Sequence, residues 1–273
     1  MPYPLFDTHT HFDVADFDHD REQLAHAAKA GGVERLILIG FVQSRFQTLI
    51  QTQHFLNQLQ DAPKSYLAPG LHPFYIEQHQ ASHLADLEGL LKAELCVAIG
   101  EIGLDTFLKQ HKQAGAFQKQ QDFFSAQLEL AQQFDKPVLL HIRKSHAETL
   151  SILKQHQFKL GGIAHAFSGG LQEAKAFIKL GFKIGITGQI TNPNAKKLHA
   201  VIQEIGAEHL VLETDCPDMT PLCCQSSTEQ RTRNTPVNLP HVLMGVAQFL
   251  DLTPDILATK LWQNSLQALH LDS

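Results

Sequence analysis

The sequence predicts an α/β protein built as a (β/α)8 TIM barrel. Eight short apolar runs recur along the chain, and a helical pattern without breakers separates most of them. Alternation of this kind predicts parallel strands joined by helices. The chain has 273 residues without a linker or a shift in composition, so we expect residues 1–273 to form a single barrel domain. A doubly wound open sheet is the alternative, and eight regular units favour closure.

The predicted strands are short and mostly apolar. Val33–Gly40 ends in a continuous apolar stretch, which is typical of a parallel strand buried on both faces. Gly181–Gly188 contains three glycines, which indicates tight packing or close approach of the backbone to another group. In chain order the eight strands are expected at Pro4–Thr8, Val33–Gly40, Tyr66–Leu71, Leu95–Gly100, Pro137–His141, Gly162–His165, Phe182–Thr187 and Leu210–Thr214.

The predicted helices fill the gaps and end at breakers. Arg21–Ala30 stops at Gly31-Gly32, which is a good helix stop. Phe117–Phe134 gathers its apolar residues on one face and stops near Pro137. The same reasoning predicts helices at Ser44–Leu59, Ala81–Ala93, His146–Gln155, Leu171–Leu180, Ala195–Ile205, Pro240–Leu250 and Pro254–Leu269.

Composition narrows the class of protein. Hydrophobic residues make up 43% of the chain and charged residues 18%, as in an ordinary globular protein. A net charge of −6 argues against binding of nucleic acid over a broad, positively charged surface. It leaves open a nucleic-acid substrate held by local contacts or by metal ions. No basic segment precedes an apolar stretch at the N-terminus, and no run reaches the roughly 18 apolar residues of a membrane span. We expect a cytoplasmic protein without a membrane partner.

The four cysteines indicate neither a disulfide framework nor a cysteine metal site. They are Cys96, Cys216, Cys223 and Cys224, and none form a C-x-x-C pair. Cys223-Cys224 has no second Cys or His at ligand spacing along the sequence. We therefore do not expect this pair to bind metal.

The strongest functional signal begins with His9 and His11. These residues follow a short apolar run, and side chains two positions apart in a strand point to the same face. Two imidazoles that project together from a rigid strand end make half of a metal site. The pair needs partners from elsewhere in the chain to become a complete site.

Polar residues at the other predicted strand ends supply those partners. Chemistry in a TIM barrel lies at the carboxyl ends of its strands, where Glu101, His141, His165 and Asp215 are expected. Together with His9 and His11 they offer four histidines and two carboxylates, which one or two divalent metals need. Two metals require a bridging ligand, and Glu101, from the middle of the barrel order, is our candidate.

These motifs resemble those of the TatD family of metal-dependent deoxyribonucleases, and most closely its YjjV-type branch. The resemblance runs from residue 7 to about residue 264. It rests on Asp7-Thr8-His9-Thr10-His11-Phe12, Gly70-Leu71-His72-Pro73, Gly100-Glu101-Ile102-Gly103-Leu104-Asp105, His141-Ile142-Arg143, His165-Ala166-Phe167-Ser168-Gly169 and Glu213-Thr214-Asp215-Cys216-Pro217.

The resemblance implies a ligand set and an activity. By resemblance, His9, His11, Glu101 and Asp215 hold one metal, whereas Glu101, His141 and His165 hold a second. His72 and Arg143 match family positions that lie beside the metals, from which they would contact the scissile phosphate. The implied activity is hydrolysis of phosphodiester bonds, as a 3′–5′ exonuclease on single-stranded DNA. The substrate would be DNA ends or a small phosphodiester, and no obligate protein partner is evident.

In the expected mechanism, two divalent ions, Mg²⁺, Mn²⁺ or Zn²⁺, activate a water and neutralise charge on the phosphate. Asp215 and Glu101 are the expected catalytic residues, and Asp215 would take the proton of the attacking water. His72 and Arg143 would contact phosphate oxygens, Arg143 with its planar donor fork.

The chain departs from the family pattern at substrate-facing positions, which weakens the substrate prediction more than the metal prediction. Lys144-Ser145 follows His141-Ile142-Arg143 in place of an acidic residue and alanine, and Thr106-Phe107 replaces an aromatic pair. The loop Thr220–Thr232 carries no family pattern. One alternative is an amidohydrolase that cuts a C–N or carboxyl-ester bond. Another is a structural metal protein without turnover, although a site of six N/O ligands without Cys is typical of catalytic centres.

Overall fold

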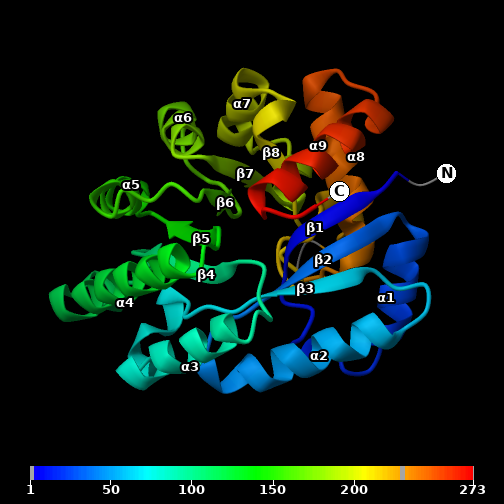
Figure 1. The fold of residues 1–273 in the computed structure, drawn as a ribbon. Helices are drawn as coiled ribbons and strands as arrows, with labels where there is room; N and C mark the ends of the chain where they lie inside the picture. Colours follow the sequence, from blue (N-terminus) through cyan, green and yellow to red (C-terminus); the bar gives the residue numbers. More distant parts are fainter. Residues whose placement is uncertain (1–2, 228–230, 273) are drawn as a thin grey trace.

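A computed structural model describes residues 3–227 and 231–272 of the chain. In these residues, eight parallel strands form the centre of the molecule and helices surround them (Figure 1). The strands are β1 (Leu5–Thr10), β2 (Val33–Ile39), β3 (Lys64–Ala68), β4 (Ile99–Asp105), β5 (Val138–Arg143), β6 (Gly162–Ala164), β7 (Phe182–Ile186) and β8 (Leu210–Leu212). Strands β1–β3 pair in sequence order, and so do β4–β8.

Backbone hydrogen bonds close these two sheets into a ring. Between β3 and β4, the Val97 N–H donates to the Leu67 carbonyl at 2.9 Å, and the Gly100 N–H donates to the Pro69 carbonyl at 3.1 Å. Between β8 and β1, the Asp215 N–H donates to the His9 carbonyl at 2.9 Å. The predicted TIM barrel is therefore confirmed.

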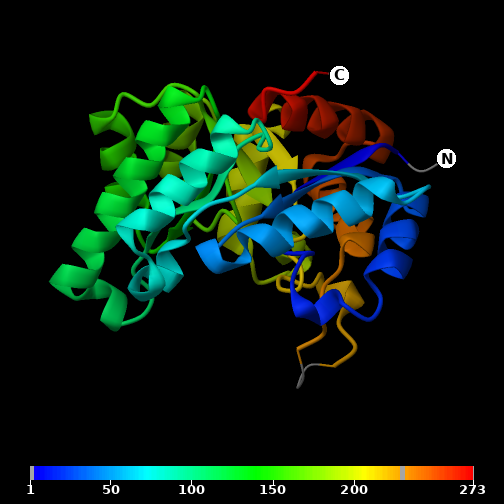
Figure 2. The same cartoon turned by 60° about the horizontal axis from the view of Figure 1, so that its bottom comes forward.

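The helices follow the strands as expected and cover the outside of the barrel (Figures 1 and 2). They are α1 (Arg21–Ala30), α2 (Phe46–Gln58), α3 (Ala81–Lys92), α4 (Ala114–Gln133), α5 (His146–Gln155), α6 (Leu171–Lys179), α7 (Lys196–Ile205), α8 (Leu239–Leu250) and α9 (Pro254–Ala268). Among the described residues no single helix has the length and apolarity of a membrane span. The segments Pro236–Leu250 and Pro254–Ala268 meet that test only as a pair bent by 110°.

Helix α9 closes one end of the barrel and leaves the other end for the functional site. Phe6, Ile163 and Val211 belong to an apolar cluster inside the barrel that also includes Leu266 and Leu269 from the C-terminal end of the chain. The Asn264 side chain donates to the carbonyls of Ala207 and Leu210, at the start of β8. Figure 2 shows α9 at one end of the barrel and the loop after β8 at the opposite end. The carboxyl ends of the strands therefore stay accessible.

The fourth predicted strand was placed too early in the sequence. The prediction was Leu95–Gly100, whereas β4 spans Ile99–Asp105. Hydropathy marks the apolar run before Gly100, but pairing with the neighbouring strand determines where β4 begins. Ile99 is the first residue of β4 to pair with β5, and Leu95 is 39% exposed. Glu101 therefore lies inside a strand and not after its end, beside a register shift between Gly100 and Ile102.

Candidate metal centre

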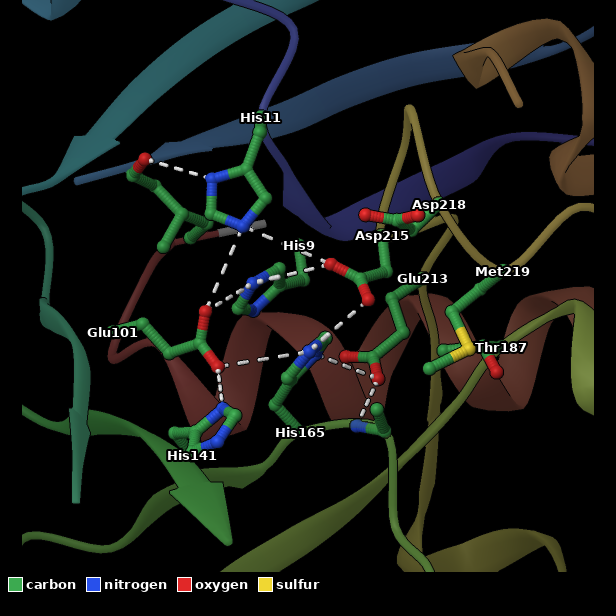
Figure 3. Close-up of polar contacts among 12 residues, drawn as sticks. His9, His11, Glu101, His141, His165, Thr187, Glu213, Asp215, Asp218 and Met219 are labelled. Carbon is green, nitrogen blue, oxygen red and sulfur yellow. Dashed lines mark hydrogen bonds and ion pairs between the residues drawn. The ribbon is translucent and has the colours of Figure 1, made fainter. Parts of the chain in front are cut away.

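The six side chains predicted as metal ligands lie together at the carboxyl end of the barrel (Figure 3). His9 belongs to β1, and His11 follows it directly. Glu101 lies in β4, His141 lies in β5, and His165 and Asp215 follow β6 and β8. Each imidazole has a nitrogen within 4 Å of a carboxylate oxygen of Glu101. The fold thus brings together residues as far apart in the sequence as His9 and Asp215.

Glu101 presents its two oxygens to different imidazoles. Its Oε2 lies 3.2 Å from His9 Nε2 and 3.6 Å from His11 Nε2. Its Oε1 lies 2.6 Å from His141 Nδ1 and 3.8 Å from His165 Nε2. The carboxylate is only 2% exposed. This arrangement fits a carboxylate that could bridge two cations, one on each side.

Asp215 lies between the same two groups of imidazoles. Its Oδ1 is 3.8 Å from the Nε2 atoms of both His9 and His11. Its Oδ2 is 3.6 Å from His165 Nε2. The resemblance assigned Asp215 to one metal only, but its second oxygen points toward His165, which belongs to the other expected set.

Groups outside the cluster fix which ring nitrogen of His11, His141 and His165 faces it: hydrogen-bond partners for the first two and a carboxylate contact for His165. His11 Nδ1 lies 3.3 Å from the Ile39 carbonyl, which can only accept, so this nitrogen carries the proton. His141 Nε2 lies 3.0 Å from Asp105 Oδ2, and His165 Nδ1 lies 3.0 Å from Glu213 Oε1. In all three residues the remaining ring nitrogen points into the cluster. A second partner of this kind is what orients histidine ligands in metal sites.

His9 provides a direct test of whether a cation fits. The residue is fully buried, and neither of its ring nitrogens has a hydrogen-bond partner among the described residues. Its ring stacks on that of His165, with ring centroids 3.4 Å apart. A second positive charge on this stacked pair is unfavourable because the two imidazolium charges would repel each other. A buried polar atom without a partner is costly. A cation within reach of His9 Nε2 would supply that partner, so the residues fit a metal.

His72 joins the cluster but differs from the ligands in its hydrogen bonding. Its Nδ1 accepts a hydrogen bond from the Phe74 backbone N–H at 2.9 Å. The proton of the neutral ring is therefore on Nε2, which lies 3.2 Å from Glu101 Oε1. Burial lowers the pKa of His72 to about 4, so the ring is neutral near pH 7. His72 is thus a hydrogen-bond donor and not a ready metal ligand.

Arg143 lies apart from the ligands, at the mouth of the same cavity. This cavity has a volume of about 930 Å³ and is lined by His72, Glu101, Arg143 and Asp215. The Arg143 guanidinium lies over the ring of Phe107, 3.7 Å from its centroid. The aromatic ring holds the guanidinium of Arg143 in place, while the N–H donors of this group stay accessible to a ligand.

The charges of the cluster support one another. Burial disfavours the ionised carboxylate of Glu101, but the surrounding imidazoles hold its pKa well below the usual range. Burial also opposes the charged form of His141, yet Glu101 and Asp105 raise its pKa to about 9. Burial likewise opposes protonation of His165, and Glu213, Asp215 and Glu101 raise its pKa well above the usual value. Protons and metal cations therefore compete for the same nitrogens.

This competition predicts that metal binds more tightly as the pH rises. His141 has its pKa raised above 6.5, so it is protonated at pH 7 and loses the proton as the pH passes through about 9. Affinity should rise by up to about tenfold per pH unit for each proton released. Isothermal titration calorimetry with Mn²⁺, in two buffers of different ionisation enthalpy, counts those protons. Affinity that stays constant across this pH range, without proton release, would contradict the prediction.

Three buried carboxyl groups behind the cluster were quoted in the sequence motifs but given no role. Asp7 accepts hydrogen bonds from the Thr214 N–H at 2.9 Å and from its hydroxyl at 2.7 Å, and burial raises its pKa to about 8. Asp105 contacts His141, and Glu213 contacts His165. Glu213 lies two positions before Asp215 in the predicted strand end, and that spacing was a signal that could have found one of them.

Gly185 in β7 makes room for one of these groups. A Cβ atom at this position would lie only 2.4 Å from Glu213 Oε2. The glycines of this strand were attributed to packing or to a close approach of the backbone. At Gly185 the close approach is to the carboxylate that contacts His165.

We expect Glu213→Gln to lower the affinity for divalent metal by about 10- to 100-fold, the usual effect of losing an outer partner of a ligand. The charge that holds His165 Nδ1 would be lost while the shape of the side chain is kept. Equilibrium dialysis followed by metal analysis measures the change. Glu208→Gln, at an exposed position after α7, is the matched control. Equal affinities in both variants would show that Glu213 has no such role.

The barrel and the cluster at its carboxyl end define a class of protein, the TIM-barrel metal-dependent hydrolases. The profile of a family described as TatD related DNase matches residues 6–270. This chain belongs to that family. The resemblance to the TatD family inferred from the motifs is therefore confirmed.

Individual relatives agree with this assignment. A protein of Escherichia coli K12 named as the uncharacterized metal-dependent hydrolase YjjV is 38% identical over 217 residues, which cover 79% of this chain and 80% of that protein. The 3′-5′ ssDNA/RNA exonuclease TatD of Edwardsiella piscicida is 33% identical over 248 residues, or 90% of this chain and 91% of the relative. The crystal structure of E. coli YjjV matches with a TM-score of 0.86 at 33% identity and covers 98% of each chain.

Proposed function

We propose that this chain is a phosphodiesterase that uses two divalent metal ions and degrades single-stranded DNA from its 3′ end. The observation that carries the proposal is the position of Glu101, whose two oxygens face two separate groups of imidazoles. His9, His11 and Asp215 would complete one site, and His141 and His165 the other. Mg²⁺, Mn²⁺ and Zn²⁺ are the candidates, and residues 1–273 would act as one domain.

When bound, such ions lower the pKa of a water molecule and offset negative charge on a phosphate. The protein groups supply the rest of the chemistry. The pKa of Asp215 lies below its usual value. Burial alone would raise this pKa, but the charges of His165, His9 and His11 lower it by more than burial raises it. Its carboxylate is therefore ionised at neutral pH and can accept the proton of an attacking water.

His72 and Arg143 are proposed to hold the substrate phosphate. The neutral His72 ring carries its proton on Nε2 inside the cavity, 3.2 Å from Glu101 Oε1, and a bound phosphate oxygen would share this donor with Glu101 or replace it as the acceptor. Arg143 offers the planar fork of donors that matches phosphate geometry. Together they would orient the phosphodiester beside the metal cluster.

Aromatic side chains at the cavity support a single-stranded substrate. Phe107, under Arg143, is 44% exposed, and Phe74, which lines the cavity, is 39% exposed. Exposed aromatic rings beside cationic groups are stacking surfaces for unpaired bases. The relative from Edwardsiella, named for activity on single-stranded DNA and RNA from the 3′ end, supports the same substrate class.

Arg143→Ala is expected to raise KM for an oligonucleotide by about tenfold, which corresponds to about 1.4 kcal/mol of binding free energy, with a smaller change in kcat. The reason is that an exposed arginine that grips a phosphate contributes chiefly to ground-state binding. Steady-state kinetics on a short single strand gives both constants. The control is Lys154→Ala, an exposed cation on α5. A fall in kcat with an unchanged KM would contradict the assigned role.

The function is tested with end-labelled single strands and with bis(p-nitrophenyl) phosphate, each with Mg²⁺, Mn²⁺ or Zn²⁺ and with EDTA. We expect metal-dependent cleavage that EDTA abolishes. A 5′-labelled strand should give a ladder of shortening products, and a 3′-labelled strand should release its label at once. Turnover of an amide or carboxyl ester, with no cleavage of either phosphodiester under any metal, would favour the amidohydrolase alternative and overturn the proposal.

A further inference from the structure

A second cluster of metal-ligating groups lies outside the centre described above. Cys223 and Cys224 form part of a short 3-10 helix, η7 (Leu222–Cys224), in the loop after β8. His241 lies in the first turn of α8. The two sulfur atoms and a His241 ring nitrogen all lie within 4.8 Å of one another. The sequence analysis found no histidine at ligand spacing because α8 brings His241 to the pair only in the folded chain.

The spacing of the two sulfurs suits a shared ion. Cys223 Sγ and Cys224 Sγ are 3.8 Å apart. Two thiolates bound to one tetrahedral ion at the usual Zn–S length of about 2.3 Å are separated by about 3.8 Å. The separation of the two sulfurs therefore already matches that of two ligands of one cation. The other two cysteines, Cys96 and Cys216, are buried elsewhere.

The ligands are accessible and otherwise uncommitted. Cys223 and His241 are exposed, and Cys224 is half-buried. Within residues 3–227 and 231–272, the His241 imidazole makes no hydrogen bond and no ion pair. Burial and the neighbouring thiol of Cys223 raise the pKa of Cys224 to about 11. The Cys224 thiol is thus protonated at neutral pH, and a cation would displace its proton.

The surroundings favour a soft ion. Cys223 and His241 line a cavity of about 930 Å³ together with Met244. Met244 lies one turn after His241 on α8, on the same face, and is 53% exposed. Thiolate, thioether and imidazole are the donors that select Zn²⁺ and Cu⁺ over Mg²⁺ or Ca²⁺. We propose that Cys223, Cys224 and His241 form a separate binding site for a thiophilic metal ion.

An ion at this site would join the wall of the catalytic cavity to α8. Met219, Thr220 and Gln225, on both sides of the cysteine pair, line the cavity that holds Glu101. Residues 228–230 of the loop Thr220–Thr232 lie outside the described part of the chain. The Leu222 N–H donates to Thr191 Oγ1 at 2.7 Å, which already ties the loop to the segment after β7. Coordination of one ion by Cys223, Cys224 and His241 would add a second connection, from this loop to α8.

Cadmium is a suitable probe because thiolate coordination to Cd²⁺ gives an ultraviolet charge-transfer band, whereas histidine and carboxylate coordination does not. The reduced full-length protein is titrated with Cd²⁺, and Zn²⁺ is then added as a competitor. We expect the band to reach the amplitude of one thiolate-bound Cd²⁺ per chain, in addition to any Cd²⁺ that the histidine and carboxylate centre binds without a band, and we expect Zn²⁺ to remove it. The readout is independent of catalysis, so it does not rest on the proposed function.

Variants locate the site. The band should vanish in Cys223→Ser/Cys224→Ser, and the affinity should fall by at least about tenfold in His241→Gln. His54→Gln, at an exposed histidine on α2, and Asp215→Asn should both titrate like the wild type. Absence of the band in the reduced wild type would overturn the proposal. So would a band that survives in the double serine variant, or unchanged affinity in His241→Gln. Circular dichroism verifies that each variant is folded.

Discussion

Replacing Glu101 with glutamine is expected to lower kcat/KM for phosphodiester cleavage by about 1,000-fold or more, which corresponds to about 4 kcal/mol of transition-state stabilisation. Glutamine keeps the size of the side chain and one oxygen, but its amide nitrogen cannot ligate a metal. Because the two oxygens of Glu101 face His9 and His141 separately, the variant should also lose about one equivalent of bound metal. Metal analysis after dialysis and steady-state kinetics measure the two effects.

The matched control is Glu129→Gln, at an exposed position on α4, which should leave metal content and kinetics unchanged. Thermal unfolding of both variants separates loss of the site from loss of the fold. If the Glu101 variant retained two metals and near-normal kcat/KM, Glu101 could not be a bridging ligand.

Asp215→Asn should lower kcat by about 100- to 10,000-fold, the range attributed to a general base. The amide oxygen of asparagine can still face His9 and His11, so most of the bound metal should remain. Asparagine cannot take a proton from the attacking water, so the loss should lie in the chemical step and not in KM. Single-turnover kinetics on a short single strand, together with metal analysis, would measure this separation.

Asp218→Asn offers a close comparison, because Asp218 lines the same cavity but pairs with Arg231 and does not contact the histidines. We expect kcat to change by less than about threefold there, as is usual for an exposed ion pair. Equal losses in the Asp215 and Asp218 variants would mean that charge in the cavity, and not a specific base, controls the rate.

Features that follow from the order of apolar runs and from polar residues at strand ends could be predicted from the sequence. Apolar runs separated by helices predicted the barrel. The rule that chemistry lies at the carboxyl ends of the strands predicted that His141, His165 and Asp215 would lie close together. Glu101 lies beside the predicted histidines in the structure, although its strand was placed too early. Hydropathy locates an apolar run, but pairing with β5 determines where β4 begins.

Features that depend on distance in three dimensions could not be predicted. The tautomer of His72 follows from the Phe74 N–H, and the close approach of Gly185 to Glu213 follows from neighbouring strands. The cysteine pair was set aside because no histidine lies near it in the sequence, yet α8 places His241 beside it. Spacing along a chain reports only local geometry, whereas these contacts join distant segments.

We propose that Glu101 bridges two metal ions, one at each of its carboxylate oxygens. The most direct test is anomalous diffraction from crystals of the protein grown with Mn²⁺. We expect two peaks, one beside His9, His11 and Asp215 and one beside His141 and His165, each within about 2.3 Å of a different oxygen of Glu101, an ordinary metal–oxygen length. A single peak that leaves one oxygen of Glu101 without a metal, or peaks remote from Glu101, would contradict the account.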